Sequence, residues 1–241
     1  MAQPKILVWD LETTDLLADF GTILCAGYKW LGEKKVNIIS LLDFPRTFEN
    51  DATDDSRLVK EFYKVLSEAD IWITWYGERF DDRMFQSKLL EYKLPPCPHV
   101  QHIDLWKTCK YRFKLSSNRL KTAAAFMDLE EKTPVLGKVW RRARTGHGPS
   151  IRYVIEHCVQ DVLVLEQAYL RMRPWVKQHP NMGIIQEQTE ACPTCGVSGK
   201  LHKRGLYRSR TRTYQRFSCQ ACGAWCRAKA LDKELSQLEY V

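Results

Sequence analysis

The segment KILVWDLE, residues 5–12, carries the pattern from which the fold is inferred first. Its run of apolar and β-branched residues is typical of a buried strand, which we expect over Lys5–Asp10. The run delivers two carboxylates, Asp10 and Glu12, and their i, i+2 spacing places both on one face of an extended chain. A polar turn after a strand has the same appearance, so the pair is a candidate site that needs partners from elsewhere.

The segments on either side of this strand predict an α/β protein. Two more β-rich runs follow at 23–30 and 35–42, and IWITWY at 71–76 is a further strand. Apolar residues at helical spacing predict helices over 56–69, 81–94, 105–113 and 118–127. Residues 137–149 are expected to form a basic loop, and Ser150 is expected to cap a long helix that reaches about Arg173.

The composition limits the class of protein. The chain has 241 residues, 44% hydrophobic and 27% charged, which suits one well-buried core with a small appended module. No apolar run is long enough to cross a bilayer and no secretory signal is present at the start, so we expect an intracellular, cytoplasmic protein with no membrane partner. The net charge of +8 favours a polyanionic partner, with nucleic acid first.

Two more acidic sites lie far along the chain. Asp81 ends the segment YGERFD at 76–81, and the long helix carries His157 and Asp161. These last two residues are spaced i, i+4 and therefore share one helix face. Each site also has an ordinary explanation, with Asp81 or Asp82 as a helix N-cap and with His157 and Asp161 as a surface pair.

Taken together, these segments resemble the DEDD superfamily of 3′-to-5′ exonucleases, most closely the proofreading domains of family B polymerases. The resemblance covers about residues 5–172 and implies a ribonuclease-H-like mixed sheet flanked by helices. Asp10 and Glu12 match the motif D-x-E, and YGERFD matches N-G-x-x-F-D except that Tyr76 replaces Asn. His157 and Asp161 match Y-x-x-x-D with His in place of Tyr.

The resemblance implies two Mg²⁺ or Mn²⁺ ions, and the charges favour them independently. Two carboxylates about 4 Å apart repel by about 4 kcal/mol at an effective dielectric of about 20, so four gathered carboxylates need cations. Oxygen ligands select Mg²⁺ or Mn²⁺, and two such ions about 4 Å apart assist phosphoryl transfer. In the family pattern Asp10 bridges both ions, Glu12 and Asp161 complete the site of the water-activating ion, and Asp81 holds the second ion.

His157 would then orient or deprotonate the attacking water. A neutral imidazole, with an ordinary pKa near 6.5, accepts a proton at neutral pH more readily than a phenol with a pKa near 10. Replacement of the family's Tyr by His therefore need not abolish activity. Asp104, in the region that resembles the family's connecting helices, is given a structural rather than a catalytic role.

The nine cysteines predict a metal site of a different kind. Two C-x₂-C-G knuckles, Cys192 with Cys195 and Cys219 with Cys222, are separated by 23 residues, a spacing typical of one tetrahedral Zn²⁺. The glycine after each knuckle allows a positive φ. Cys226 and His202 remain possible substitute ligands.

The segment between the knuckles looks like the hairpin of a zinc ribbon. Residues 200–217 hold seven Lys or Arg and no acidic residue, interleaved with Tyr207, Tyr214 and Phe217. Such a surface suits nucleic acid, with aromatic rings stacking on bases and cations following phosphates, although a solvated ribbon with packing aromatics is the alternative. The second knuckle also resembles zinc ribbons of DNA transaction proteins such as transposases. Candidate nucleic-acid-binding residues are Lys138, Arg141, Arg142 and Arg144 of the basic loop, and Lys203, Arg204, Arg208, Arg210, Arg212 and Arg216 of the hairpin.

The sequence therefore predicts a metal-dependent 3′-to-5′ exonuclease with a zinc ribbon for nucleic-acid binding, DNA being preferred over RNA. The expected domains are an exonuclease domain over 1–173, a linker over 174–190, a zinc ribbon over 191–230 and a tail over 231–241. The basic loop at 138–147 is expected near the active site, because it precedes the helix that carries His157. Two alternatives remain open, a structure-specific endonuclease on the same fold and a catalytically inactive nucleic-acid-binding adaptor.

Overall fold

The computed structural model describes residues 4–129, 134 and 136–230. They form two compact units, one over Pro4–Arg171 and a second that begins at Met172, and each is described by itself. The expected tail at 231–241 lies outside the described residues. Among the residues described, no helix combines the length and the apolar character needed to cross a membrane.

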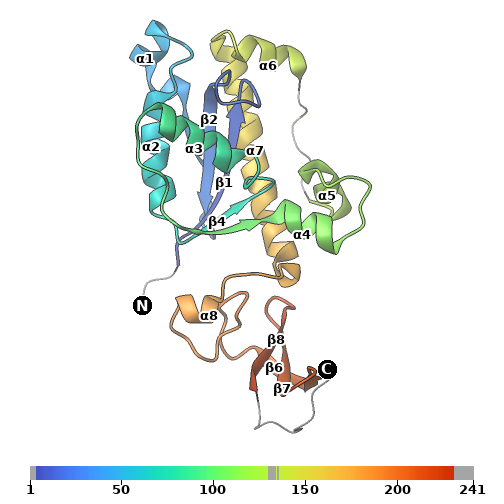
Figure 1. Cartoon of the computed structure of the whole chain (residues 1–241). Helices are drawn as coiled ribbons and strands as arrows, with labels where there is room; N and C mark the ends of the chain where they lie inside the picture. Colours follow the sequence, from blue (N-terminus) through green and yellow to red (C-terminus); the bar gives the residue numbers. More distant parts are fainter. Residues whose placement is uncertain (1–3, 130–133, 135, 231–241) are drawn as a thin grey trace. The chain divides into compact units, whose positions relative to one another are not determined.

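The first unit is built on a five-stranded mixed sheet in the order β3-β2-β1-β4-β5 (Figure 1). The antiparallel strands are β1 (Ile6–Thr13), β2 (Ile23–Trp30) and β3 (Asn37–Ser40). On its other edge β1 is parallel to β4 (Ile71–Thr74), which is parallel to β5 (Gln101–Asp104). The expected fold class, a mixed sheet flanked by helices, is confirmed.

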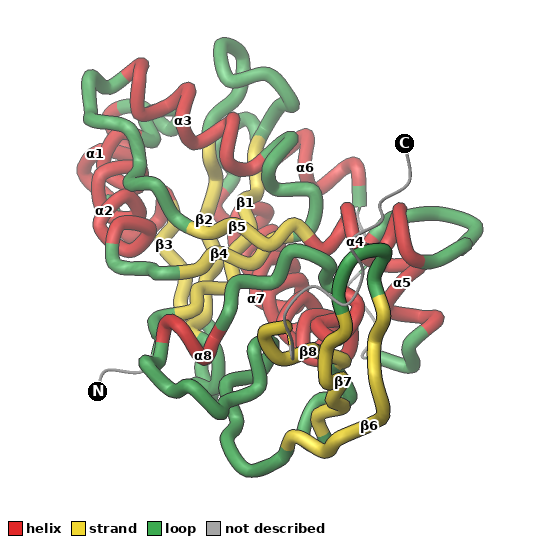
Figure 2. The backbone as a smooth tube through the Cα atoms, turned by 60° about the horizontal axis from the view of Figure 1, so that its bottom comes forward, coloured by secondary structure: helices red, strands yellow, loops and turns green. Residues whose placement is uncertain are grey.

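Side chains alternate along β1 between two helical layers. Trp9 packs edge to face against Phe62 of α2 (Ser56–Ser67), with 5.7 Å between ring centroids. Phe62 in turn contacts Phe85 of α3 (Asp81–Glu91), so this side of the sheet holds the aromatic core. The neighbouring Asp10 faces the opposite side, where α7 (Gly148–Met172) crosses the sheet (Figure 2), because its carboxylate lies within 4.8 Å of Cys158 Sγ of that helix.

Helix α7 approaches β2 very closely. A Cβ atom at Gly27 would lie 2.6 Å from Cys158 Sγ, so glycine is required there. The apolar face of α7 has the expected helical spacing, with Val154, Cys158 and Val162 fully buried. A buried ion pair between Lys29 of β2 and Glu166 adds a polar anchor on the same helix face. The predicted long helix that reaches about Arg173 is thus confirmed, and the structure shows that its apolar face packs on the sheet.

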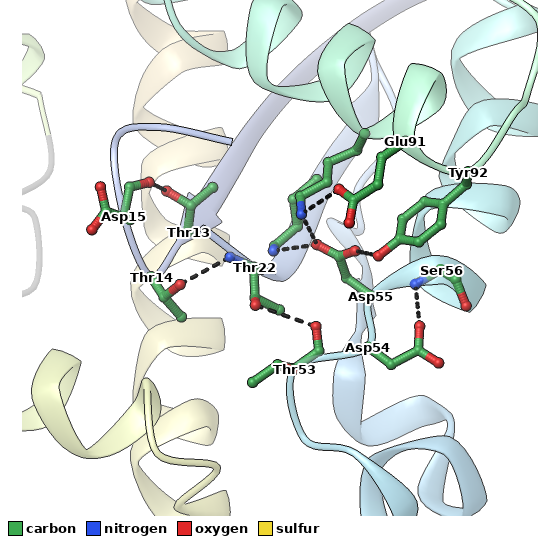
Figure 3. A network of polar contacts seen from close by, with 12 residues as sticks. Thr13, Thr14, Asp15, Thr22, Thr53, Asp54, Asp55, Ser56, Glu91 and Tyr92 are labelled. Carbon is green, nitrogen blue, oxygen red and sulfur yellow. Dashed lines mark hydrogen bonds and ion pairs between the residues drawn. The ribbon is translucent and has the colours of Figure 1, made fainter. Parts of the chain in front are cut away.

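A buried carboxylate ties three other elements together (Figure 3). Asp55, which immediately precedes α2, is fully buried. It accepts hydrogen bonds from the Ile23 amide at 2.7 Å, at the start of β2, and from the Tyr92 hydroxyl after α3. Lys88 of α3 lies 3.8 Å from the same carboxylate. The loop between β1 and β2 is closed by a hydrogen bond from the Thr22 amide to the Thr14 hydroxyl. The Asp55 network therefore also fixes the end of this loop that enters β2.

Several local expectations were wrong. The basic loop contains a helix, α6 (Gly137–Ala143), because Lys and Arg are good helix formers and Ala143 finds a buried position. Helix α7 begins at Gly148, and Ser150 is not its cap, since the Ser150 hydroxyl pairs with His147 Nδ1 at 2.8 Å. The short elements that no periodicity indicated are η1 (Leu41–Asp43), α1 (Pro45–Asn50) and β5. The two expected connecting helices are α4 (Leu105–Arg112) and α5 (Leu120–Phe126).

The second unit holds an antiparallel sheet of three strands. These are β6 (Leu201–Arg208), β7 (Thr213–Cys219) and β8 (Trp225–Ala230), in that order. The segment expected as a linker contains two short helices, η2 (Arg173–Trp175) and α8 (Met182–Ile185). The Asn181 side chain caps α8, and the Met182 amide donates to the Pro193 carbonyl at 2.8 Å, which ties α8 to the first knuckle.

Candidate active site and cysteine cluster

The end of β1 and the middle of α7 bring three candidate residues together. Ligand atoms of Glu12, His157 and Asp161 all lie within 4.8 Å of one another. His157 Nε2 is 3.9 Å from Glu12 Oε1 and 3.7 Å from Asp161 Oδ2, so the imidazole edge lies between two carboxylates. His157 and Asp161 are buried, as expected for side chains in the interface between helix and sheet.

Asp10 lies on the same side of β1 as Glu12. A second group of ligand atoms within 4.8 Å of one another consists of Asp10, Glu12 and Cys158. Glu12 therefore belongs to both groups and joins them. The Cys158 thiol donates to the Asp10 carbonyl at 3.8 Å, and it fills the space directly under the strand. The i, i+2 spacing of the two carboxylates thus has the predicted consequence, because β1 continues as a strand to Thr13.

Asp81 reaches the same strand from another direction. It is the first residue of α3, it is 4% exposed, and its Oδ1 accepts a hydrogen bond from the Leu11 amide at 3.1 Å. Pairing of β1 with β4 ends at Val8 and Ile73, so this carboxylate occupies the position beside β1 where β4 no longer runs. Phe80, not Asp81 or Asp82, is the N-cap residue of α3.

Burial governs the charge state of Asp81. Desolvation, with smaller contributions from the nearby carboxylates of Asp104 and Asp82, raises the pKa of its carboxyl to about 7 against the opposing hydrogen bond from the Leu11 amide. Burial also raises the pKa of Asp104, whose Oδ1 accepts from the amides of Tyr76 at 2.8 Å and Trp106 at 3.0 Å. A buried carboxyl of this kind is stabilised as an anion when a cation binds beside it.

Tyr76 and Trp140 each pack edge to face against another ring. Tyr76 has a left-handed backbone with φ of 70°, and its ring lies edge to face against Trp106. Trp140 of α6 packs edge to face against His157, with 5.3 Å between ring centroids. The segment at 137–149 therefore lies beside the site, and its basic residues Lys138, Arg141, Arg142 and Arg144 are exposed. Arg144 also pairs at 3.5 Å with Asp15, in the loop that follows β1.

Sequence reasoning missed two residues of this site. Trp140 was not predicted as a site residue, because the segment that contains it was interpreted only from its basic side chains. Cys158 was not singled out, although it follows His157 directly and has the helical spacing of the buried face of α7. Apolar periodicity combined with the position of His157 is a signal that would have found Cys158.

The four knuckle cysteines of the second unit form a compact cluster. Their Sγ atoms lie within 4.8 Å of one another, with Cys192 and Cys222 at 3.8 Å and Cys195 and Cys219 at 3.8 Å. A tetrahedral ion with Zn–S bonds of about 2.3 Å requires sulfur atoms about 3.8 Å apart, so the donor set fits Zn²⁺. A disulfide requires about 2.05 Å, and all four thiols are free. Cys226 and His202 do not join this group of ligands.

Local backbone geometry supports the cluster. Gly196 and Gly223, which follow the knuckles, have φ of 74° and 78°, as the sequence predicted. Burial opposes ionisation of Cys219, but hydrogen bonds from the amides of Cys222 and Ala221 and from neighbouring thiols lower its pKa below the ordinary value. Burial raises the pKa of its knuckle partner Cys222, and the thiolate form of both cysteines is the one that binds zinc.

Comparison with protein families now places the first unit. A family model described as RNase H superfamily matches residues 7–173, which is most of the chain and includes all five candidate active-site residues. The chain belongs to the RNase H superfamily. No curated protein matches it.

A solved structure shares the fold of this RNase H superfamily protein. It is the family B DNA polymerase from the hyperthermophilic archaeon Pyrobaculum calidifontis, with a TM-score of 0.55 and 13% sequence identity. The match covers 73% of this chain but only 26% of the polymerase chain. At this identity the likeness shows the fold. Superfamily membership supports a nuclease that uses divalent metal and acts on nucleic acid.

Proposed function

We propose that the chain is a 3′-to-5′ exonuclease that removes nucleotides from nucleic acid with two bound Mg²⁺ or Mn²⁺ ions. One observation carries the proposal. Glu12, His157 and Asp161 converge within 4.8 Å, although they come from a strand and a helix more than a hundred residues apart. Asp10 joins this group through Glu12, and Asp81 is attached to the backbone between them.

The residues fit divalent cations. Four carboxylates around one strand end repel one another, each close pair by about 4 kcal/mol at 4 Å and an effective dielectric of about 20. Asp81 in addition has a raised pKa, which is a sign of a buried charge that lacks compensation. Asp10, Glu12, Asp81 and Asp161 would hold the ions. When bound, such ions neutralise charge on the phosphoryl group and favour ionisation of the attacking water.

The chain's own groups complete the chemistry. The Nε2 atom of His157, 3.9 Å from Glu12 Oε1 and 3.7 Å from Asp161 Oδ2, accepts the proton of the attacking water, and the Trp140 ring packs against the imidazole. Water attacks phosphorus, the bond from phosphorus to the 3′ oxygen breaks, and a nucleoside 5′-monophosphate leaves. The shortened strand keeps a 3′ hydroxyl. The exposed cations of α6 would follow the phosphates beside the site.

The choice of exonuclease polarity and of DNA rests on the resemblance to proofreading domains, which the shared fold with a DNA polymerase supports. The cysteine cluster is proposed to hold one structural Zn²⁺, and the hairpin to bind nucleic acid, with Arg204 and Arg216 on the strands and Arg210 and Arg212 at the turn as its contacts. A zinc ribbon would then keep long substrates on the enzyme.

Product ladders test the proposal. Single-stranded and duplex DNA and RNA, labelled at the 5′ end, are incubated with Mg²⁺ or Mn²⁺ and with Asp10→Asn as the control for contaminating nucleases. Progressive shortening from the 3′ end that is absent in the control supports the exonuclease. Internal cuts would indicate an endonuclease instead, and retention of substrate without cleavage would indicate an adaptor. Equal rates on DNA and RNA would remove the preference for DNA.

A further inference from the structure

The three-stranded sheet of the second unit has two chemically different sides. Residues paired across antiparallel strands point to the same side, and alternate residues of one strand point to opposite sides. On β7, Phe217 pairs with Lys203 and Cys226, whereas Tyr214 pairs with Tyr207, and Arg216 with Arg227. We name the side with Phe217 the cavity side and the side with Tyr214 the open side.

The cavity side faces the rest of its own unit. Leu201, Lys203, Phe217 and Cys226 line a cavity of about 940 Å³ together with the segment that contains α8. Arg227 also borders this cavity, but its guanidinium lies over the Tyr207 and Tyr214 rings. Glu187 and Glu190 line the same cavity. They are the two acidic residues that the sequence has between Met172 and Ala230, so they offset the charge of Lys203 and disfavour a phosphate there.

The open side is basic and aromatic. Register and the contacts of their side chains place on it His202, Arg204, Tyr207, Tyr214, Arg216, Trp225 and Arg227. All of these are exposed except Tyr214, which is half-buried. No acidic residue lies on this side among the described residues of the three strands. Its positive charge is therefore not offset locally.

The aromatic rings and guanidinium groups of the open side already contact one another before any ligand binds. The Arg216 guanidinium lies over the Trp225 ring at 4.8 Å, and Trp225 is still 59% exposed. Arg227 lies over both Tyr214 at 4.1 Å and Tyr207 at 5.1 Å. Arg216 is held further by a hydrogen bond from its Nε to the Arg204 carbonyl at 3.0 Å. Little side-chain freedom is left to lose when a ligand binds.

We propose that the open side binds single-stranded nucleic acid, with an unpaired base stacked on Trp225 and phosphates on Arg204, Arg216 and Arg227. This inference deepens the proposed function, on which it rests. A flat surface of exposed rings between cations is the arrangement that recognises unpaired bases, because in a duplex the base faces are hidden and only phosphates and groove edges are available. Neither Trp225 nor Arg227 stood out in the sequence, and Phe217, which did, points to the cavity side.

Two charge-matched double variants test the side that binds. Arg216→Gln with Arg227→Gln removes two positive charges from the open side, and Lys203→Gln with Arg208→Gln removes two from the other side, where register places both. Affinity of the full chain for labelled oligo(dT) is measured over a range of salt concentrations, in an Asp10→Asn background that prevents cleavage. The open-side pair is expected to weaken binding and to reduce the salt slope by about 1.4, at about 0.7 per phosphate on single strands. Equal losses from both pairs would overturn the assignment to one side.

Trp225 tests the stacked base. Trp225→Ala is expected to weaken binding of oligo(dT) by about 5- to 100-fold, with a much smaller effect on a duplex of the same length, and Trp225→Phe is expected to restore most of the affinity. Zinc content of each variant reports that the second unit is intact. An equal effect on single strand and duplex, or no effect, would overturn the proposal. Cleavage of short oligonucleotides by wild-type protein is measured separately, so failure of the nuclease proposal is distinguishable from failure of this one.

Discussion

Asp81 Oδ1 and the Leu11 amide form a 3.1 Å hydrogen bond between residues that are 70 positions apart in the sequence. The bond places an acidic side chain from the start of α3 against the strand that carries Asp10 and Glu12. Because the same carboxyl is buried, its charge lowers stability unless a cation binds.

Asp81→Asn keeps an oxygen that accepts from the Leu11 amide and removes the buried charge. In the absence of Mg²⁺ and Mn²⁺ we expect the free energy of unfolding to stay the same or to rise, while cleavage with metal falls by at least about 100-fold. Denaturant titration and single-turnover kinetics measure the two quantities. Asp82→Asn, next to it, is the control. Cleavage within tenfold of wild type would remove Asp81 from the site.

His157→Ala is expected to lower turnover by about 10²- to 10⁴-fold, because the proton of the attacking water loses its acceptor. Because the acceptor must be unprotonated, the wild-type rate should also rise with pH as the imidazole loses its proton, and His157→Ala should lack that rise. His99→Ala, at an exposed position, serves as the control. A loss below tenfold with an unchanged pH profile would mean that His157 only packs between Glu12 and Trp140.

The cysteine cluster predicts one tightly held zinc per chain. Cys219→Ser is expected to abolish zinc binding and to unfold the second unit while the first keeps its helical signal, because apparent zinc binding energies of about 10–16 kcal/mol supply the folding energy of such modules. Cys226→Ser is the matched control, since this cysteine does not join the cluster. Elemental analysis gives the zinc content, and zinc lost equally from both variants would redefine the ligand set.

The buried carboxyl of Asp55 is expected to make the free energy of unfolding depend on pH, independently of catalysis. Burial raises the pKa of its carboxyl, in spite of the opposing hydrogen bonds from Ile23 and Tyr92 and the charge of Lys88. Because the folded state then holds this proton more tightly than the unfolded chain, Asp55 lowers the free energy of unfolding as pH rises from about 4, the ordinary carboxyl value, through the raised pKa. Asp55→Asn should flatten this decline in thermal melts, and an unchanged slope would contradict the assignment.

The sequence was informative wherever a local period controls the structure. Alternation around Asp10 and Glu12 predicted both the strand and the shared face of the two carboxylates, and helical spacing predicted that His157 and Asp161 lie together. The hydrogen bond between Asp81 and the Leu11 amide could not be predicted from a local period. Asp81 reaches this amide only because the pairing of β1 with β4 has already ended there. The alternation of side chains along β7 could be predicted from the sequence. Which side of the sheet α8 covers could not, because it depends on the path of the chain between α8 and the first knuckle.

The helix α6 illustrates a different difficulty. Its basic residues are all exposed, and Ala143 is its buried residue, so no apolar stripe marks it as a helix. The contact between Trp140 and His157 depends on that helix and on the start of α7 at Gly148. The residues of this site could thus be predicted individually from the sequence. The contacts between them could be determined only from the structure.

The buried Lys29–Glu166 pair has a consequence for how the gene for this protein can change. Glu166 also accepts a hydrogen bond from the Gly32 amide at 3.2 Å. The two contacts of Glu166 fix the position of α7 relative to β2 and to the chain that follows β2. Asp161 lies little more than one turn away on the same helix. A single inserted residue between them would rotate one relative to the other by about 100°, and either the ion pair would be broken or Asp161 would leave Glu12. Insertions in that short interval should therefore be far less tolerated than substitutions at the same positions.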